Sequence, residues 1–160
     1  MSKKDEKFNE LLHFQPAEIK DWIIGIDKML TEGGCKAAVD NKGNFTYTSK
    51  QSKKIVCRIT MNEFGCLIRP NTNIAISSDA IDAELSESML DAMRGARGCG
   101  GCAKKNPNFV QCGHGGAYKF IQGGESFESC RFVGFNFALD DAKERELLKK
   151  WLECELTYEG

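Results

Sequence analysis

The sequence predicts an α+β fold in which helices pack on one mostly antiparallel sheet. Three observations lead to this prediction: an amphipathic helix near the N-terminus, a run of short strand-like segments separated by tight turns, and an amphipathic helix at the C-terminus. Tight turns join antiparallel neighbours, whereas parallel strands need crossover connections of a dozen or more residues. Because the chain has 160 residues and no internal repeat, we expect one α+β domain spanning residues 1–160.

The N-terminal helix is predicted from about Pro16 to Thr31. Apolar residues recur at intervals of three or four, the spacing that places them on one helix face. These residues are Ile19, Ile23, Ile26 and Leu30. Pro16 suits the start of a helix, and Gly33-Gly34 suits its end. A shorter helix is expected before it, around Lys7–His13.

A four-strand meander is predicted next, because the period of the apolar residues changes from helical to alternating. The expected strands are Cys35–Asp40, Phe45–Ser49, Lys53–Met61 and Cys66–Pro70. In the third strand, strict alternation places Ile55 and Cys57 on one face and Val56 and Arg58 on the other. This alternation predicts that Cys57 is a core residue.

The second half of the chain is predicted to contain a helix over Asp79–Arg94, or two short helices with Ser86 capping the second. A strand pair, Ala117–Gln122 and Phe127–Ala138, is expected around the turn Gly123-Gly124. The chain then ends in a helix from about Asp141. Asp141 and Glu144 approximate a capping box at its start.

Composition and charge exclude several classes of protein. Hydrophobic residues make up 41% of the chain and charged residues 28%, the balance of an ordinary globular protein. A net charge of −1 gives no overall attraction to nucleic acid or to an anionic membrane. The polar N-terminus lacks a signal peptide, and apolar runs such as Trp22-Ile23-Ile24 are too short to span a membrane. We therefore expect a cytoplasmic protein with no membrane partner.

The eight cysteines fall into two groups. Four are scattered over predicted helices and strands: Cys35, Cys57, Cys66 and Cys154. Of these, Cys57, Cys66 and Cys154 are expected to be small core residues. The other four lie in a Cys/Gly-rich loop at about residues 95–130: Cys99, Cys102, Cys112 and Cys130. Without a sign of export, a metal site explains such a cluster better than disulfides do.

Zinc is the metal that this cysteine cluster predicts. Structural zinc takes four ligands in a tetrahedral arrangement, and thiolate is a preferred donor. The spacing is Cys99-x2-Cys102-x9-Cys112-x17-Cys130, with glycines beside the cysteines that permit tight turns. We expect these four cysteines to bind zinc, with His114 as a substitute ligand. An Fe–S cluster has the same ligands and is the less favoured alternative.

The function expected from these features is that of a non-enzymatic, zinc-stabilised domain that binds an unknown protein or small-molecule partner. No catalytic residues are identified. One alternative is a thiol-redox or metal-dependent enzyme that uses the Cys99-x-x-Cys102 pair. The other is nucleic-acid binding, which is not favoured because aromatic residues are sparse around the local cations. These cations are Arg94, Arg97, Lys104, Lys105 and Lys119.

The order of residues also resembles a group of uncharacterised small bacterial proteins. The resemblance covers roughly residues 17–156 and is carried by a Cys…Cys…Tyr-x-Phe…Cys-Arg pattern. The matching residues are Cys99, Cys112, Tyr118-Lys-Phe120 and Cys130-Arg131. In that pattern the fourth cysteine lies nearer the third, so Cys102 departs from it. The resemblance implies a shared cysteine site and no known activity.

Overall fold

The computed structural model describes residues 2–62, 65–70, 86–95, 117–122, 125–130 and 136–157. The described helices and strands, in chain order, are α1 (Lys3–Leu12), α2 (Ala17–Glu32), β1 (Cys35–Val39), β2 (Asn44–Ser49), β3 (Ile55–Asn62), β4 (Gly65–Pro70), α4 (Glu87–Gly95), β5 (Ala117–Gln122), β6 (Glu125–Cys130), β7 (Phe137–Ala138) and α6 (Ala142–Thr157). Five strands form one antiparallel sheet in the order β1-β2-β3-β4-β7, and β5 and β6 form a separate two-stranded sheet. The predicted α+β class is confirmed.

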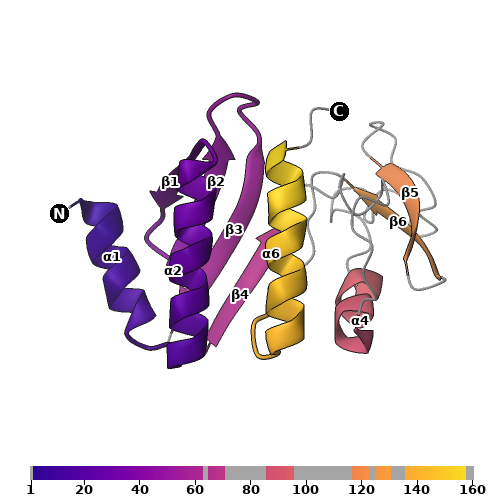
Figure 1. The fold of residues 1–160 in the computed structure, drawn as a ribbon, viewed down its shortest axis with the longest axis horizontal. Coiled ribbons are helices and arrows are strands. Elements are labelled where there is room, and N and C mark those ends of the chain that lie inside the picture. The colour runs from indigo at the N-terminus through magenta and orange to yellow at the C-terminus, as the bar shows by residue number, and fades with distance from the viewer. Residues whose placement is uncertain are drawn as a thin grey trace.

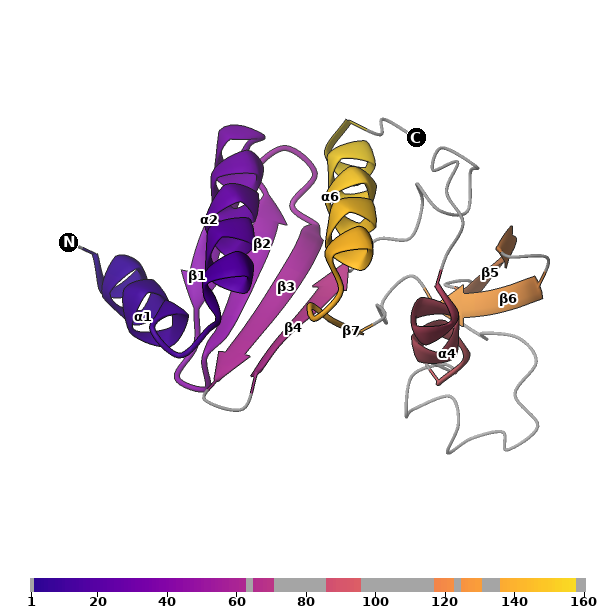
Figure 2. The same cartoon turned by 60° about the horizontal axis from the view of Figure 1, so that its bottom comes forward.

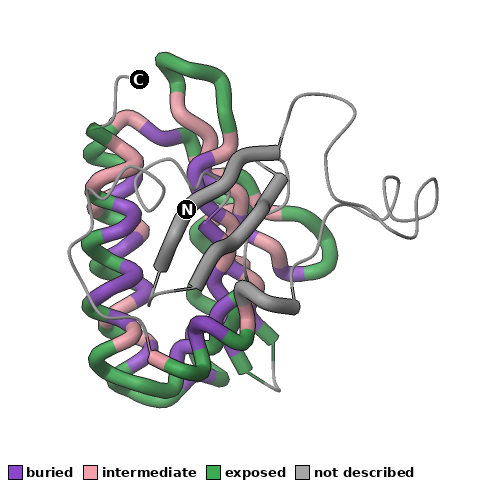
Figure 3. The backbone as a smooth tube through the Cα atoms, turned by 90° about the vertical axis from the view of Figure 1, so that its right-hand side faces the viewer, coloured by how far each residue is buried: buried purple, intermediate pink, exposed green. Residues whose placement is uncertain are grey.

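Helices α1, α2 and α6 lie on the same face of the five-stranded sheet (Figures 1 and 2). The core fills the space between these helices and the sheet, and Figure 3 shows buried positions on both. Its largest fully buried side chains include Trp151 of α6 and Phe45 and Tyr47 of β2. Within the part of the chain that the structure describes, every helix is too short or too polar to cross a lipid bilayer.

The N-terminal helices form where the sequence carries their start and stop signals. Helix α2 begins after Pro16 and ends at Gly33, as predicted, and Ile19, Ile23, Ile26 and Leu30 are buried. Helix α1 starts earlier than predicted, at Lys3. Ser2 and Asp5 form a capping box there, which satisfies backbone N–H groups that the first turn leaves without partners.

The meander follows the predicted strand order, with one correction in β3. A register shift between Tyr47 and Thr48 of β2 marks a β-bulge in the pairing with β3. As a result, the consecutive residues Val56 and Cys57 are both buried, and Ile55 pairs with Thr48. Strict alternation had placed Ile55 with Cys57 on the core face, which the structure contradicts. Cys57 itself is fully buried, so its predicted core position is confirmed.

Two predicted helix caps form in the second half of the chain, and a hydrogen bond links the two helix starts. Ser86 caps α4, because its Oγ accepts a hydrogen bond from the Met89 N–H at 3.2 Å. Asp141 caps α6, since its Oδ1 accepts from the Glu144 N–H at 3.0 Å. The Glu144 carboxylate accepts a hydrogen bond from the Ser86 hydroxyl and thereby joins the two helix starts. Residues 79–85 of the predicted middle helix lie outside the described residues.

The strand predicted over Phe127–Ala138 is divided between two sheets. Its first part belongs to β6, which pairs with β5 around the predicted turn. Its last two residues form β7, which pairs with Leu67 and Ile68 of β4. The predicted hairpin is thus confirmed for Ala117–Gln122 and Glu125–Cys130 and wrong for Phe137–Ala138.

Candidate functional site

The predicted metal site falls mostly outside the described residues. Cys99, Cys102, Cys112 and His114 lie there, whereas Cys130 is the last residue of β6. Within the described residues, no group of three or more His, Cys, Asp or Glu side chains is arranged to hold a metal ion. The predicted ligand set therefore stays a prediction, and the described hairpin is the part of the structure that bears on it.

Cys130 lies at the open end of the β5–β6 hairpin. It pairs with Ala117, the first residue of β5, so this pair is the farthest from the turn. Antiparallel partners lie about 4.5–5.5 Å apart between Cα atoms. Cys112 and His114 precede Ala117 by five and three residues, so extended-chain geometry keeps their Cα atoms within about 18 Å and about 11 Å of it. The hairpin thus shortens the longest separation in the predicted ligand set, the one between Cys112 and Cys130.

The scattered cysteines lie in or against the main core, whereas Cys130 lies on the separate β5–β6 hairpin. Cys35, Cys57 and Cys66 are buried in the core, and Cys154 is half-buried against it. Burial raises the pKa of Cys35 and of Cys57, and it raises the pKa of Cys66 to about 12. A thiol that resists ionisation is a poor nucleophile and a poor metal ligand. The predicted core positions are confirmed for Cys57 and Cys66, whereas Cys154 is only partly buried at the edge of the core.

The basic segment is described at two of its five cations. Arg94 lies near the end of α4, and Lys119 lies on β5. The residue directly across from Lys119 on β6 is Glu128, so the register places opposite charges at neighbouring positions. Arg97, Lys104 and Lys105 lie outside the described residues. The described part therefore adds no observation in favour of a nucleic-acid interface.

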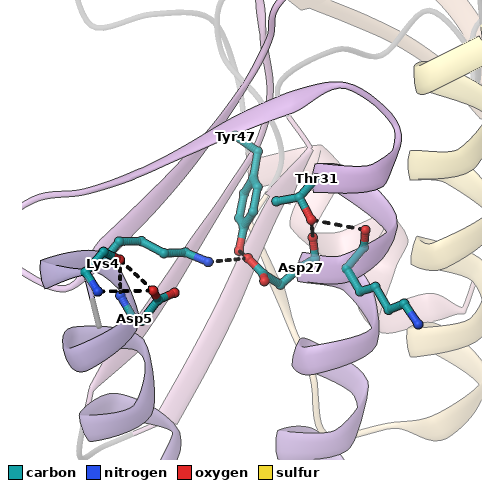
Figure 4. A network of polar contacts seen from close by, with 7 residues as sticks. Lys4, Asp5, Asp27, Thr31 and Tyr47 are labelled. Atoms are coloured by element: carbon teal, nitrogen blue, oxygen red, sulfur yellow. Dashed lines mark hydrogen bonds and ion pairs between the residues drawn. The ribbon is translucent and has the colours of Figure 1, made fainter.

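A polar network joins α1, α2 and β2 (Figure 4). Asp27 Oδ1 accepts hydrogen bonds from Lys4 Nζ at 2.9 Å and from the Tyr47 hydroxyl at 2.8 Å. Lys4 Nζ also lies 4.8 Å from the centre of the Phe8 ring. Burial, followed by the charge of Asp27, raises the pKa of Tyr47 far above its usual range. Because each charged group has a partner, the network is best explained as a packing contact that fixes α1 against the sheet.

The sheet face opposite the helices carries charged residues that sequence analysis missed. Residues paired directly across antiparallel strands share a face, so one row contains Ala38, Thr46, Arg58 and Arg69. Arg58 of β3 and Arg69 of β4 are direct partners. The sequence contained a signal for this pair, because both residues are equally distant from the middle of the turn expected between the predicted strands Lys53–Met61 and Cys66–Pro70.

Comparison of the chain with known protein families, curated proteins and solved structures found no significant match. Two features of the described residues remain as candidate functional sites. One is the hairpin that ends in Cys130, and the other is the sheet face that carries Arg58 and Arg69.

Proposed function

We propose that this chain is a non-enzymatic, zinc-stabilised α+β domain that binds a partner or a small ligand. The proposed zinc ligands are Cys99, Cys102, Cys112 and Cys130, with His114 as a substitute. The observation that carries the proposal is the position of Cys130 at the open end of a two-stranded hairpin. The described residues of the sheet face opposite the helices offer a candidate surface for this binding.

A metal ion has a physical reason to be present at this end of the hairpin. An isolated two-stranded hairpin is at best marginally stable in water, and β5 and β6 pair only with each other among the described strands. Zinc bound by Cys130 and by a cysteine before β5 would hold the two strand ends together. Because the ligand set assembles only in the folded state, the binding free energy becomes folding free energy.

The test is the metal content of protein purified without chelator, together with hydrogen exchange before and after zinc removal. We expect about one zinc per chain, the stoichiometry of a single four-ligand site. Chelation should raise amide exchange in β5 and β6, while β2 and β3 keep their protection. Those central strands hydrogen-bond to neighbours on both sides and do not depend on the hairpin.

Two cysteine variants make the test specific. Cys130→Ser should lose zinc, because a hydroxyl is a far weaker zinc ligand than a thiolate. Cys154→Ser is the matched control, since Cys154 packs at the edge of the main core, and it should keep its zinc. Metal-free protein that takes up no added zinc, or equal zinc content in both variants, would contradict the proposal.

A further inference from the structure

The sheet face opposite the helices is positively charged. The strands of the five-stranded sheet contain no Asp or Glu, and their charged residues are Lys36, Arg58 and Arg69. The register places all three on the face that α1, α2 and α6 leave uncovered (Figure 2). This face therefore attracts anions, and its two arginines lie side by side.

Arg58 and Arg69 form a pair that is unfavourable by itself. They are direct cross-strand partners, which brings their Cβ atoms to about 4.5–5.5 Å, and like charges at this spacing destabilise a sheet. Arg69 is half-buried, and its Nε is fully buried with no hydrogen-bond partner. Burial and the neighbouring charge of Arg58 lower the pKa of Arg69. A buried donor without a partner costs free energy that a bound acceptor would recover.

Two other cations among the described residues, Arg145 and Lys4, have partners of a kind that this pair lacks. The buried Arg145 donates to the Leu139 carbonyl at 2.6 Å and pairs with Glu18 at 3.5 Å. Lys4 pairs with Asp27 at 2.9 Å. Among the described residues, no carboxylate forms an ion pair with Arg58 or Arg69. Among the described residues, the arginine pair therefore has no counter-charge.

We infer that Arg58 and Arg69 form a binding site for the phosphate group of a small ligand. Guanidinium groups present planar sets of N–H donors that match the oxygens of a phosphate, and two of them balance the charge of a phosphate monoester, about −2 at neutral pH. Thr46, the other direct neighbour of Arg58, places a hydroxyl group in the same row. The inference names a ligand class for the binding role proposed above and rests on that role, but it does not depend on zinc.

A small ligand fits this face better than a single-stranded nucleic acid. Nucleic-acid-binding sheets stack bases on exposed aromatic side chains. In the described five-stranded sheet the aromatic residues are Phe45, Tyr47 and Phe137, and all three are buried. The uncovered face instead offers threonines, with Thr60 donating a hydrogen bond to Asn44 at 2.7 Å. The described residues of this face can bind a phosphate group but offer no ring on which a base could stack.

The test is a titration of the full chain with inorganic phosphate, followed through the arginine Nε–Hε signals in NMR spectra. We expect the Arg69 and Arg58 signals to shift and saturate, while the Arg145 signal stays in place as an internal control. Sodium chloride at equal ionic strength corrects for screening. If neither pair signal moves beyond the chloride control while zinc is bound at one per chain, the phosphate site is wrong and the zinc-stabilised domain stands.

Charge variants distinguish a built site from diffuse attraction. Arg69→Gln and Arg58→Gln should each weaken phosphate binding by about tenfold or more, the effect of losing hydrogen bonds to a charged group. Lys36→Gln removes the same charge from the same face and should change the affinity by less than about threefold. Equal losses in all three variants would overturn the inference. Without phosphate, Arg58→Gln should raise the melting temperature, because it relieves the repulsion on Arg69.

Two further titrations test the ligand class. Acetate at equal ionic strength should produce a weaker response, since a single carboxylate balances only one of the two positive charges. A stronger response to acetate would overturn the phosphate assignment. A single-stranded oligonucleotide that binds far more tightly than phosphate, and only when Arg69 is present, would replace the small ligand with a nucleic acid.

Discussion

Because Cys57 and Cys66 of the meander are buried, we predict that the fold loses stability in mild alkali. Burial raises the pKa of Cys66 from its ordinary value of 9.0 to about 12 and raises that of Cys57 as well. In both cases the folded state holds its proton more tightly than the unfolded chain does. The contribution to stability is therefore complete below about pH 9 and is lost as the pH rises above that value.

The size of the loss at pH 10 follows from the unfolded chain alone. This pH is one unit above the ordinary thiol pKa of 9.0, so a cysteine in the unfolded chain is mostly ionised. Both thiols stay protonated in the folded state. Ionisation then stabilises the unfolded state by about 1.4 kcal/mol per thiol, or about 3 kcal/mol for the two. At pH 8 the same effect is negligible. Because a domain of this kind is stable by only about 5–15 kcal/mol, the change is large.

Urea unfolding at pH 8 and pH 10, with reductant present, measures this loss. Cys57→Ala and Cys66→Ala should each reduce the difference between the two pH values by about 1.4 kcal/mol. Ile59→Val is the control, because Ile59 is fully buried and has no titratable group. Its pair with Ile68 lies between Cys57 and Cys66 in the sheet. It should cost about 0.5–1.5 kcal/mol equally at both pH values. If the double cysteine variant loses as much free energy as the native chain, the buried thiols do not cause the effect.

Two substitutions test the packing of the N-terminal half. Tyr47→Phe removes the 2.8 Å hydrogen bond to Asp27, which keeps Lys4 as a partner. We expect the free energy of unfolding to fall by about 1–2 kcal/mol and the melting temperature by about 3–6 °C. An unchanged melting temperature would show that the hydroxyl contributes nothing to stability. Gly43→Ala should cost about 2 kcal/mol or more in urea unfolding, because φ is +85° and an added Cβ would lie 2.8 Å from the Met61 carbonyl oxygen. Gly34→Ala, at φ +91° in open space, should cost only about 1 kcal/mol, and equal losses would mean that the close contact has no effect.

Local signals in the sequence were sufficient for most of the helices and strands. The apolar spacing and the Gly33-Gly34 stop located α2, and Asp141 located the start of α6. Tight turns established the antiparallel order of β1 to β4, since each strand pairs with the next. These features depend on neighbours a few residues apart, so a single sequence contains the physical information that determines them.

The cysteine cluster was also predicted from local spacing, but its geometry was not. The spacing predicts Cys99, Cys102, Cys112 and Cys130 as ligands without indicating how the gap of 17 residues between the last two would be closed. The register of β5 and β6 brings Cys130 next to Ala117 and closes most of that gap. Pairing between strands depends on hydrogen bonds and side-chain contacts across the hairpin, which a spacing rule does not contain.

Contacts between distant segments decided the remaining features. The β-bulge beside Val56 turned Ile55 away from the core, and the last residues of a predicted strand joined β4 instead of β5. Glu144 serves as the acceptor for Ser86, 58 residues away in the chain. The pairing of Arg58 with Arg69, on which the proposed phosphate site is built, belongs to the same class. Periodicity assigns a residue to a face of its own strand, but only the assembled sheet determines which charge lies beside it.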